Sequence, residues 1–296
     1  MRRTTIVTLT GLALVGVLTA CGSAQPGEAV PAAGSGQAAP ATTSAPGGGG
    51  AASGPLESLT GKAVEAMKVK KTAKISVSGS GPGAEAIGGN GQIRLDGNDL
   101  SMAMTSKVPG EDGQPAGETK LLFVGNTLYV EPPKDMPVPP GKKWMKIDPK
   151  GTDVMSKLLG PLAQQMRDSA DPKVTFQKFG DGGTLGGSTP TTLDGAPATQ
   201  HKIDVDLNRL IAKTADPLQK LSLELLVKNG VTSMTYDFWT DAQNLPLQFQ
   251  FSQKMPNAPA ATTVTAKYTA WGEPVDIKAP ADSEIAPPVE LPQPPR

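Results

Sequence analysis

The only histidine of the chain, His201, is the single imidazole that acid–base, nucleophilic or metal chemistry could use. It opens an alternating stretch in which Ile203 and Val205 fall on the same face, a pattern more typical of a packed strand residue than of a ligand. A zinc site needs three or four nitrogen, sulfur or oxygen ligands, and a chain with one histidine and no free cysteine is not expected to form one. The sequence therefore predicts a protein that is not an enzyme, holds no metal and needs no cofactor.

Other chemical motifs fail on spacing or charge. Asp204, Asp206 and Asn208 imitate the opening of a calcium-binding loop, but Arg209 stands at the sixth position, where glycine is needed. The chain carries 28 basic and 28 acidic residues, without a block of one sign. Nucleic acid is therefore not an expected partner, because phosphate binding needs a basic face.

The only cysteine, Cys21, closes a leader that is typical of exported proteins. Two arginines follow Met1, and an apolar run extends from Leu9 to Leu18. A transmembrane helix needs roughly 20 apolar residues, whereas a signal-peptide core needs about 7 to 15. The last four residues, Leu18-Thr19-Ala20-Cys21, resemble the bacterial lipobox, whose cysteine takes a diacylglyceryl group on its thiol. We expect residues 1–20 to be removed as a lipoprotein signal peptide, and acyl chains such as palmitate to anchor Cys21 at the extracytoplasmic face of the cell membrane.

Composition divides the rest of the chain into three parts. Residues 21–55 are rich in Gly, Pro and Ala and carry one charge, Glu28, which predicts a lipidated, flexible tether without a core. Residues 56–285 contain the periodic apolar segments and form the expected folded domain. The tail, residues 286–296, contains five prolines and should be loose.

The periodic segments predict an α+β fold. Helical periods begin at Pro55, lie between Asp153 and Asp168, and extend from Pro217 to about Asn229. Glycines at 180–187 and prolines at 132–141 predict surface loops. Alternating residues predict strands around 75–77, 93–95, 100–104, 121–124, 127–130, 143–147, 174–179, 198–207, 231–241, 247–254 and 262–271, with 275–277 continuing the last. Because strands and helices do not alternate, we expect a mostly antiparallel sheet with a few helices gathered on one face.

Five short segments, in their order and spacing, resemble the LppX/LprA/LprF/LprG-like family of actinobacterial lipoproteins. The segments are Gly125–Val130, Lys143–Asp148, Asp194-Gly195 leading to His201–Val205, Phe238–Asp241 and Tyr268–Gly272. The resemblance covers about residues 59–281 and implies a half-barrel similar to the carriers LolA and LolB: one curved antiparallel sheet with about three helices on its concave face. It also implies that acyl chains of a lipid or glycolipid lie between sheet and helices and are carried across the cell envelope, and it supplies no catalytic motif.

Two functions remain open at this stage. The first is a noncatalytic carrier of an apolar ligand, and the second is a surface interaction or sensor module with a dry core that binds another envelope protein. Methionine suits adaptable apolar surfaces, yet it fills gaps in an ordinary core equally well. The candidate ligand-binding residues are Met102, Met104, Val154, Leu158, Leu162, Met166, Leu221 and Leu225.

Overall fold

The computed structural model describes residues 53–288, except 83, 85–86, 98, 110–114, 133–137 and 255–258. The expected signal peptide, Cys21 and the tether up to residue 52 lie outside the described residues. So do the centre of the proline-rich loop and the end of the tail. Within the described part, no helix is both long and apolar enough to cross a membrane.

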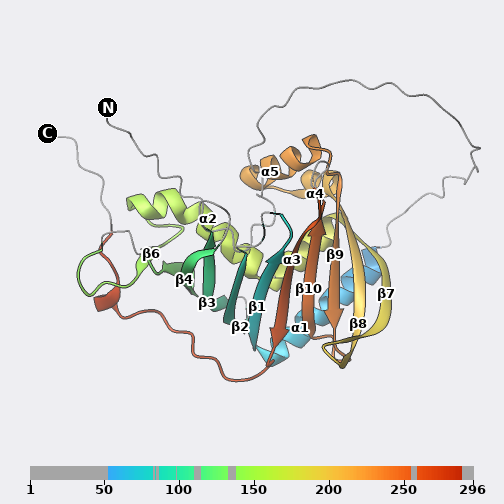
Figure 1. Ribbon diagram of the computed structural model, residues 1–296, viewed down its shortest axis with the longest axis horizontal. Helices are drawn as coiled ribbons and strands as arrows, with labels where there is room; N and C mark the ends of the chain where they lie inside the picture. Colours follow the sequence, from blue (N-terminus) through green and yellow to red (C-terminus); the bar gives the residue numbers. More distant parts are fainter. Residues whose placement is uncertain are drawn as a thin grey trace, which may run out of the picture.

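Among the described residues, eleven strands form one open sheet in which every neighbouring pair is antiparallel (Figure 1). Their order is β6-β5-β4-β3-β2-β1-β11-β10-β9-β8-β7, so that two meanders meet where β1 pairs with β11. The strands are β1 Thr72–Ser80, β2 Gly88–Asp96, β3 Asp99–Pro109, β4 Pro115–Val124, β5 Thr127–Val130, β6 Met145–Ile147, β7 Gly183–Leu193, β8 Ala196–Asp206, β9 Ser233–Thr240, β10 Pro246–Gln253 and β11 Thr262–Thr269.

Burial alternates along β8, which places one face of the sheet against the core. His201, Ile203 and Val205 are buried, while the residues between them are exposed. At the turn from β7 to β8, Asp194 and Gly195 have φ angles of 50° and 83°. A two-residue hairpin turn with two positive φ angles favours such residues because it matches the twist of the strands. The predicted one-faced antiparallel strand and its turn are confirmed.

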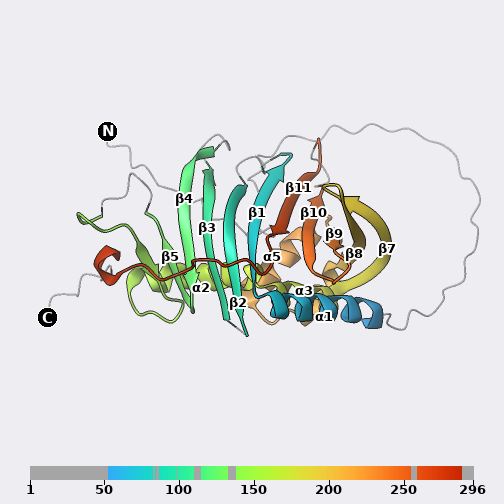
Figure 2. The ribbon, with the colours of Figure 1, turned by 90° about the horizontal axis from the view of Figure 1, so that it is seen from below.

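Five α-helices, where about three were expected, accompany the sheet in the described part of the chain. They are α1 Ser53–Lys70, α2 Val154–Ala170, α3 Pro172–Gly182, α4 Leu207–Lys213 and α5 Pro217–Lys228. Because β6 and β7 are opposite edges of the sheet, the chain between them must cross its whole width, and α2 and α3 make this crossing on one face (Figure 1). Figure 2 shows the sheet curling toward the side that carries α1 and α3. The predicted α+β fold with one curved antiparallel sheet is confirmed.

Two aspartates fix the beginnings of helices as the sequence predicted. The side chain of Asp153 accepts a hydrogen bond from the backbone N–H of Ser156 (3.0 Å), and Asp216 accepts one from Gln219 (2.7 Å). Such N-caps satisfy backbone donors that have no partner inside the helix. Hydrogen bonding to Ser156 also lowers the pKa of the Asp153 carboxyl.

The predictions for residues 174–187 are wrong. The expected strand at 174–179 is part of helix α3. Of the expected glycine-rich loop at 180–187, residues 180–182 end α3 and residues 183–187 begin strand β7. Phe176 and Phe179 are both buried, and their three-residue spacing places them on one helical face. β7 pairs with β8 along its length, with an irregularity between Leu185 and Gly187. The helix packs Phe176 against Phe238 and Phe249 on distant strands, whereas β7 is held by its hairpin pairing with β8, and both kinds of contact outweigh local propensity.

Aromatic rings fill the space between α3 and strands β9 and β10. The ring centre of Phe176 lies 5.4 Å from that of Phe238 and 5.6 Å from that of Phe249, and Phe179 lies 5.0 Å from Tyr236. Phe238 and Phe249 stack at 4.4 Å. Since rings at these separations pack directly, this half of the sheet carries a filled core.

The chain after β11 does not continue as the predicted strand at 275–277. Residues with positive φ, Ala270 at 54° and Gly272 at 82°, turn it away, and it runs past the strand ends toward β6 (Figure 1). Ile277 is buried, and its carbonyl accepts a hydrogen bond from Arg94 of β2 (3.3 Å). Ile285 then pairs with Trp144 as a parallel bridge. The C-terminal segment therefore covers one end of the sheet.

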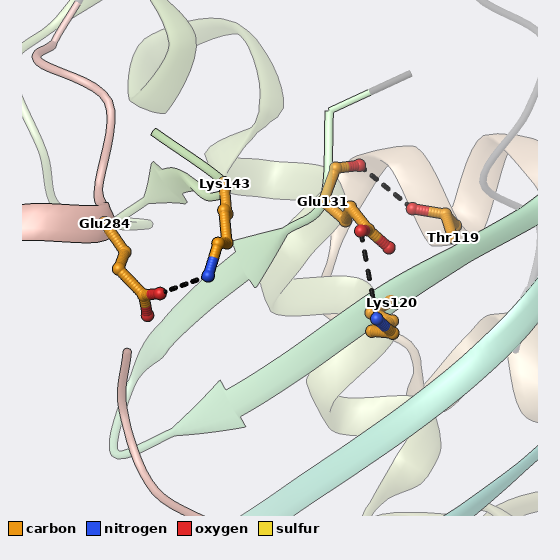
Figure 3. A network of polar contacts seen from close by, with 5 residues as sticks. All are labelled: Thr119, Lys120, Glu131, Lys143 and Glu284. Carbon is orange, nitrogen blue, oxygen red and sulfur yellow. Dashed lines mark hydrogen bonds and ion pairs between the residues drawn. The ribbon is translucent and has the colours of Figure 1, made fainter. Parts of the chain in front are cut away.

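Polar contacts join this C-terminal segment and the neighbouring strands at the β6 edge (Figure 3). Lys143 Nζ donates to Glu284 Oε1 (2.6 Å), a hydrogen bond that raises the pKa of Lys143. Thr119 Oγ1 donates to the carbonyl of Glu131 (3.0 Å), and Lys120 Nζ lies 3.9 Å from Glu131 Oε1. Exposed ion pairs add little stability, so these contacts mainly orient the chain.

Candidate functional site

His201 is buried on the core face of β8, with hydroxyl groups beside both ring nitrogens. Ser188 Oγ lies 2.7 Å from Nδ1, and Thr240 Oγ1 lies 3.1 Å from Nε2. Burial lowers the pKa of the imidazole, which favours its neutral form. Ser188 and His201 have the spacing of a nucleophile and base, but a hydroxyl stands where a carboxylate would stabilise the imidazolium. The arrangement satisfies a packed histidine and joins β7, β8 and β9.

The acidic and histidine side chains of the described residues form no cluster of three or more that could hold a metal ion. Asp206, from the imitation calcium motif, instead caps α4 by accepting a hydrogen bond from the N–H of Arg209 (3.0 Å). Asp204 accepts one from the hydroxyl of Thr235 on β9 (2.8 Å). The two carboxylates therefore act separately, as a helix cap and a cross-strand contact.

The eight predicted ligand residues divide into a buried and an exposed group. Met102 and Met104 on β3 and Met166 on α2 are buried in one continuous apolar cluster, and Val154 is half-buried at the start of α2. The exposed group consists of two leucine pairs, Leu158 and Leu162 on α2, and Leu221 and Leu225 on α5. The structure thus brings the methionines into the core and leaves the leucines at the surface.

The buried face of α2 differs from its predicted apolar stripe. Ser156, Gly160 and Ala163 are buried, and their small side chains allow a close approach to neighbouring segments. A Cβ on Gly160 would lie 3.1 Å from Cα of Pro149, in the loop before α2. The Oγ of Ser156 accepts a hydrogen bond from the N–H of Asp148 (3.0 Å). Small residues therefore form the side of α2 that packs against neighbouring segments, and the larger apolar residues lie beside this packed side.

These larger residues form a ridge that leads from solvent into the core. Leu158, Leu162 and Met166 follow each other at intervals of four residues, so they lie along one side of α2. Their exposed fractions fall from 70% through 39% to 3%. Because α2 starts next to β6 and runs inward across the sheet, the ridge begins at the sheet edge (Figure 1). We call these three residues the α2 ridge.

Two features of α2 bear on how the ridge could be used. Pro161 lies inside the helix and lacks the N–H that would bond to the carbonyl of Lys157, so the hydrogen-bond ladder is interrupted between the two leucines. Arg167, directly after the ridge, is half-buried, and its Nε has no hydrogen-bond partner among the described residues. The weakened part of the helix therefore lies at the exposed end of the ridge, and the cationic group lies at its buried end.

Sequence reasoning missed the aromatic residues that close the other half of the core. Phe176 and Phe179 were assigned to a strand, although their spacing of three fits a helix equally well. Tyr236 and Tyr268 are partners of this cluster, and burial raises the pKa of both phenols, that of Tyr268 to about 12. Their neutral hydroxyls are thus part of an apolar interior.

A shallow groove of about 540 Å³ lies on the outer side of α1, beside the turn between β9 and β10. It was not foreseen, because its two walls are distant in sequence. Charged residues line it together with the exposed Val69. The lining residues are Glu57, Ser58, Gly61, Lys62, Glu65, Ala66, Val69, Gln243 and Asn244.

Comparisons with known proteins found neither a matching family model nor a matching curated protein. Among solved structures, the chain is similar to LprF from Mycobacterium bovis, with 14% identity and a TM-score of 0.48 over 77% of this chain and 97% of that one. It is also similar to the lipoprotein LppX from Mycobacterium tuberculosis, with 12% identity and a TM-score of 0.44 over 76% and 98%. A chain of the MucA/MucB complex from Pseudomonas aeruginosa matches with 10% identity and a TM-score of 0.34 over 80% and 64%. At such low identities, none of these likenesses assigns a family, a ligand or an activity to this chain.

Proposed function

We propose that this protein is a noncatalytic lipoprotein, anchored to the membrane through Cys21, that binds the acyl chains of a lipid or glycolipid and carries them across the cell envelope. The observation that carries this proposal is the α2 ridge. An apolar strip that passes from 70% exposed Leu158 to buried Met166 gives an acyl chain a continuous apolar path into the interior.

Methionines support the same half of the sheet as the binding region. Met102 and Met104 belong to the buried cluster that also contains Met166. Methionine has three rotatable bonds and a polarizable thioether, so a methionine-rich layer can repack around an inserted chain more readily than rings can. We place the ligand between α2 and strands β2–β5, and not under α3, where the aromatic rings are in direct contact.

The interruption of α2 and the Nε of Arg167, which has no hydrogen-bond partner among the described residues, suit such a ligand. Pro161 weakens the helix beside the exposed leucines, which makes a local shift of α2 less costly. At the buried end of the ridge, the guanidinium of Arg167 offers a donor for a polar group on the inserted part of the ligand, the kind of contact that orients a mostly apolar ligand.

The test is the lipid content of the mature protein purified from an actinobacterial host, measured by native mass spectrometry. We expect a copurifying lipid in the parent protein and its loss in the Leu158→Gln/Leu162→Gln double variant. Because both leucines are exposed, their substitution should change stability by only about 0.5 kcal/mol each. Val69→Gln, which alters an exposed apolar residue on α1, is the matched control.

A parent protein that carries no lipid, and that also fails to bind the fluorescent fatty acid cis-parinaric acid after delipidation, would contradict the proposal. Equal lipid content in the parent and the double variant would contradict the role of the ridge while leaving lipid binding intact.

The groove on α1 favours a second candidate, a surface interaction or sensor module with a dry core. Its walls combine Lys62, Glu57 and Glu65 with exposed Val69, a mixture that suits a polar protein surface. If the parent protein is free of lipid, a photo-crosslinker at position 62 should capture an envelope protein in cells, and Glu65→Lys should abolish the crosslink.

A further inference from the structure

The outer face of helix α5 carries apolar residues that the fold does not use. Leu223 and Leu226 are buried and account for its inward face. Leu221 and Leu225, one turn apart, point away from that face and are 53% and 43% exposed. A helix at the surface of a water-soluble fold ordinarily shows charged or polar residues on its outer side. A second apolar face on α5 therefore needs a partner.

Basic residues surround these two leucines. Lys228 follows Leu225 by three positions and Leu221 by seven, so it lies on the same helical face. From Asp206 to Lys228 the charged residues are Arg209, Lys213, Lys220 and Lys228 against Asp206, Asp216 and Glu224, an excess of one positive charge. Among the described residues, the three lysines make no ion pair. Asp216 is engaged as the N-cap of α5.

The position of α5 leaves this face accessible. Among the helices, α5 contacts α4, and α4 in turn contacts α3 and β8. Figure 1 shows α5 at the periphery of the molecule, beyond the ends of β9 and β10. A flat surface could therefore approach Leu221, Leu225 and Lys228 without meeting the sheet.

We propose that the outer face of α5, formed by Leu221, Leu225 and Lys228, docks onto an anionic membrane surface. Short helices with leucines beside lysines lie in the membrane interface, because the apolar side chains enter the acyl boundary while the ammonium groups meet anionic headgroups. The expected tether supports the choice of this partner. A flexible chain of the length between Cys21 and Ser53 spans roughly 30 Å, which keeps the domain close enough for a weak contact to form. The inference does not require a ligand in the core.

The test uses the mature chain from residue 22, which lacks the acylated cysteine, so that an anchor cannot contribute to binding. Its partitioning is measured by sedimentation with vesicles of phosphatidylcholine alone and with vesicles that also contain phosphatidylglycerol. We expect binding to the phosphatidylglycerol vesicles, lowered roughly tenfold in the Leu221→Gln/Leu225→Gln variant. Lys228→Gln should lower it roughly fivefold on anionic vesicles and leave neutral vesicles unaffected. Val69→Gln and Lys62→Gln are the matched controls on α1 and should bind like the parent.

Three outcomes would overturn the inference: no binding of the parent to anionic vesicles, equal loss in the α1 controls, or dimerisation of the parent through the leucine pair. Analytical ultracentrifugation of the parent and the leucine variant detects the last of these. Lipid content is measured in the same samples. If only the α5 variant loses vesicle binding and only the α2 variant loses copurified lipid, the two proposals stand separately, and either can fail without the other.

Discussion

Replacing Phe176 with alanine tests whether α3 packs tightly against strands β9 and β10. The ring is 4% exposed and lies 5.4 to 6.2 Å from the rings of Phe179, Phe238 and Phe249. Truncating a buried phenylalanine to alanine typically costs roughly 3 to 5 kcal/mol, because apolar burial is lost and a cavity remains. Three aromatic partners place the expected value at the upper end of about 3 to 5 kcal/mol, because each pair adds about 0.5 to 1.5 kcal/mol beyond its buried area.

The assay is thermal and urea unfolding of delipidated protein, followed by circular dichroism. For a domain of this size, 1 kcal/mol corresponds to about 2–4 °C, so a loss of about 5 kcal/mol in Phe176→Ala should lower Tm by roughly 10–20 °C. Leu158→Ala is the matched control on α2, and at 70% exposure it should stay within about 0.5 kcal/mol of the parent. A loss below about 1 kcal/mol for Phe176→Ala would refute the reasoning, since it would mean that α3 is not packed and that the ligand space extends beneath it.

Three further predictions concern His201, Cys21 and the start of the folded domain. Burial lowers the pKa of His201 below its usual 6.5, so the unfolded state binds the proton first as the pH falls. The stability present above pH 6.5 should therefore decline as the pH falls through the folded pKa, and His201→Asn should remove this pH dependence in urea unfolding. NMR titration of the single imidazole checks the pKa independently. Replacing Cys21 with serine should leave an uncleaved precursor that does not incorporate palmitate, whereas a labelled, membrane-bound variant would contradict the lipobox assignment. A chain that starts at Ser53 should keep the Tm of the longer mature chain, and a fall of many degrees would show that residues 22–52 pack on the domain.

The fold class could be predicted from local sequence signals that do not depend on tertiary contacts. The alternation of His201, Ile203 and Val205 specifies a strand with one buried face, and Asp194-Gly195 specifies a tight turn, because both depend on backbone geometry over a few residues. Asp216 before Pro217 marks a helix start for the same reason. These signals sufficed for the antiparallel pairing of strands that short connections join, but they assigned residues 174–179 to a strand and missed the start of β7.

Only the tertiary structure decided which apolar residues enter the core. Leu162 and Ala163 are neighbours on α2, and periodicity favours the leucine as the buried one. The alanine is buried instead, on the side of the helix where Gly160 closely approaches Pro149. Phe176 could belong to a strand or a helix by sequence, and contacts with Phe238 and Phe249 on distant strands select the helix. The position of α2 and α3 across one face depends on β6 and β7 being opposite edges of the sheet, which is set by the pairing of β1 with β11. That pairing joins residues nearly two hundred positions apart, so no local pattern encodes it, and the placement of the α2 ridge across the sheet depends on it.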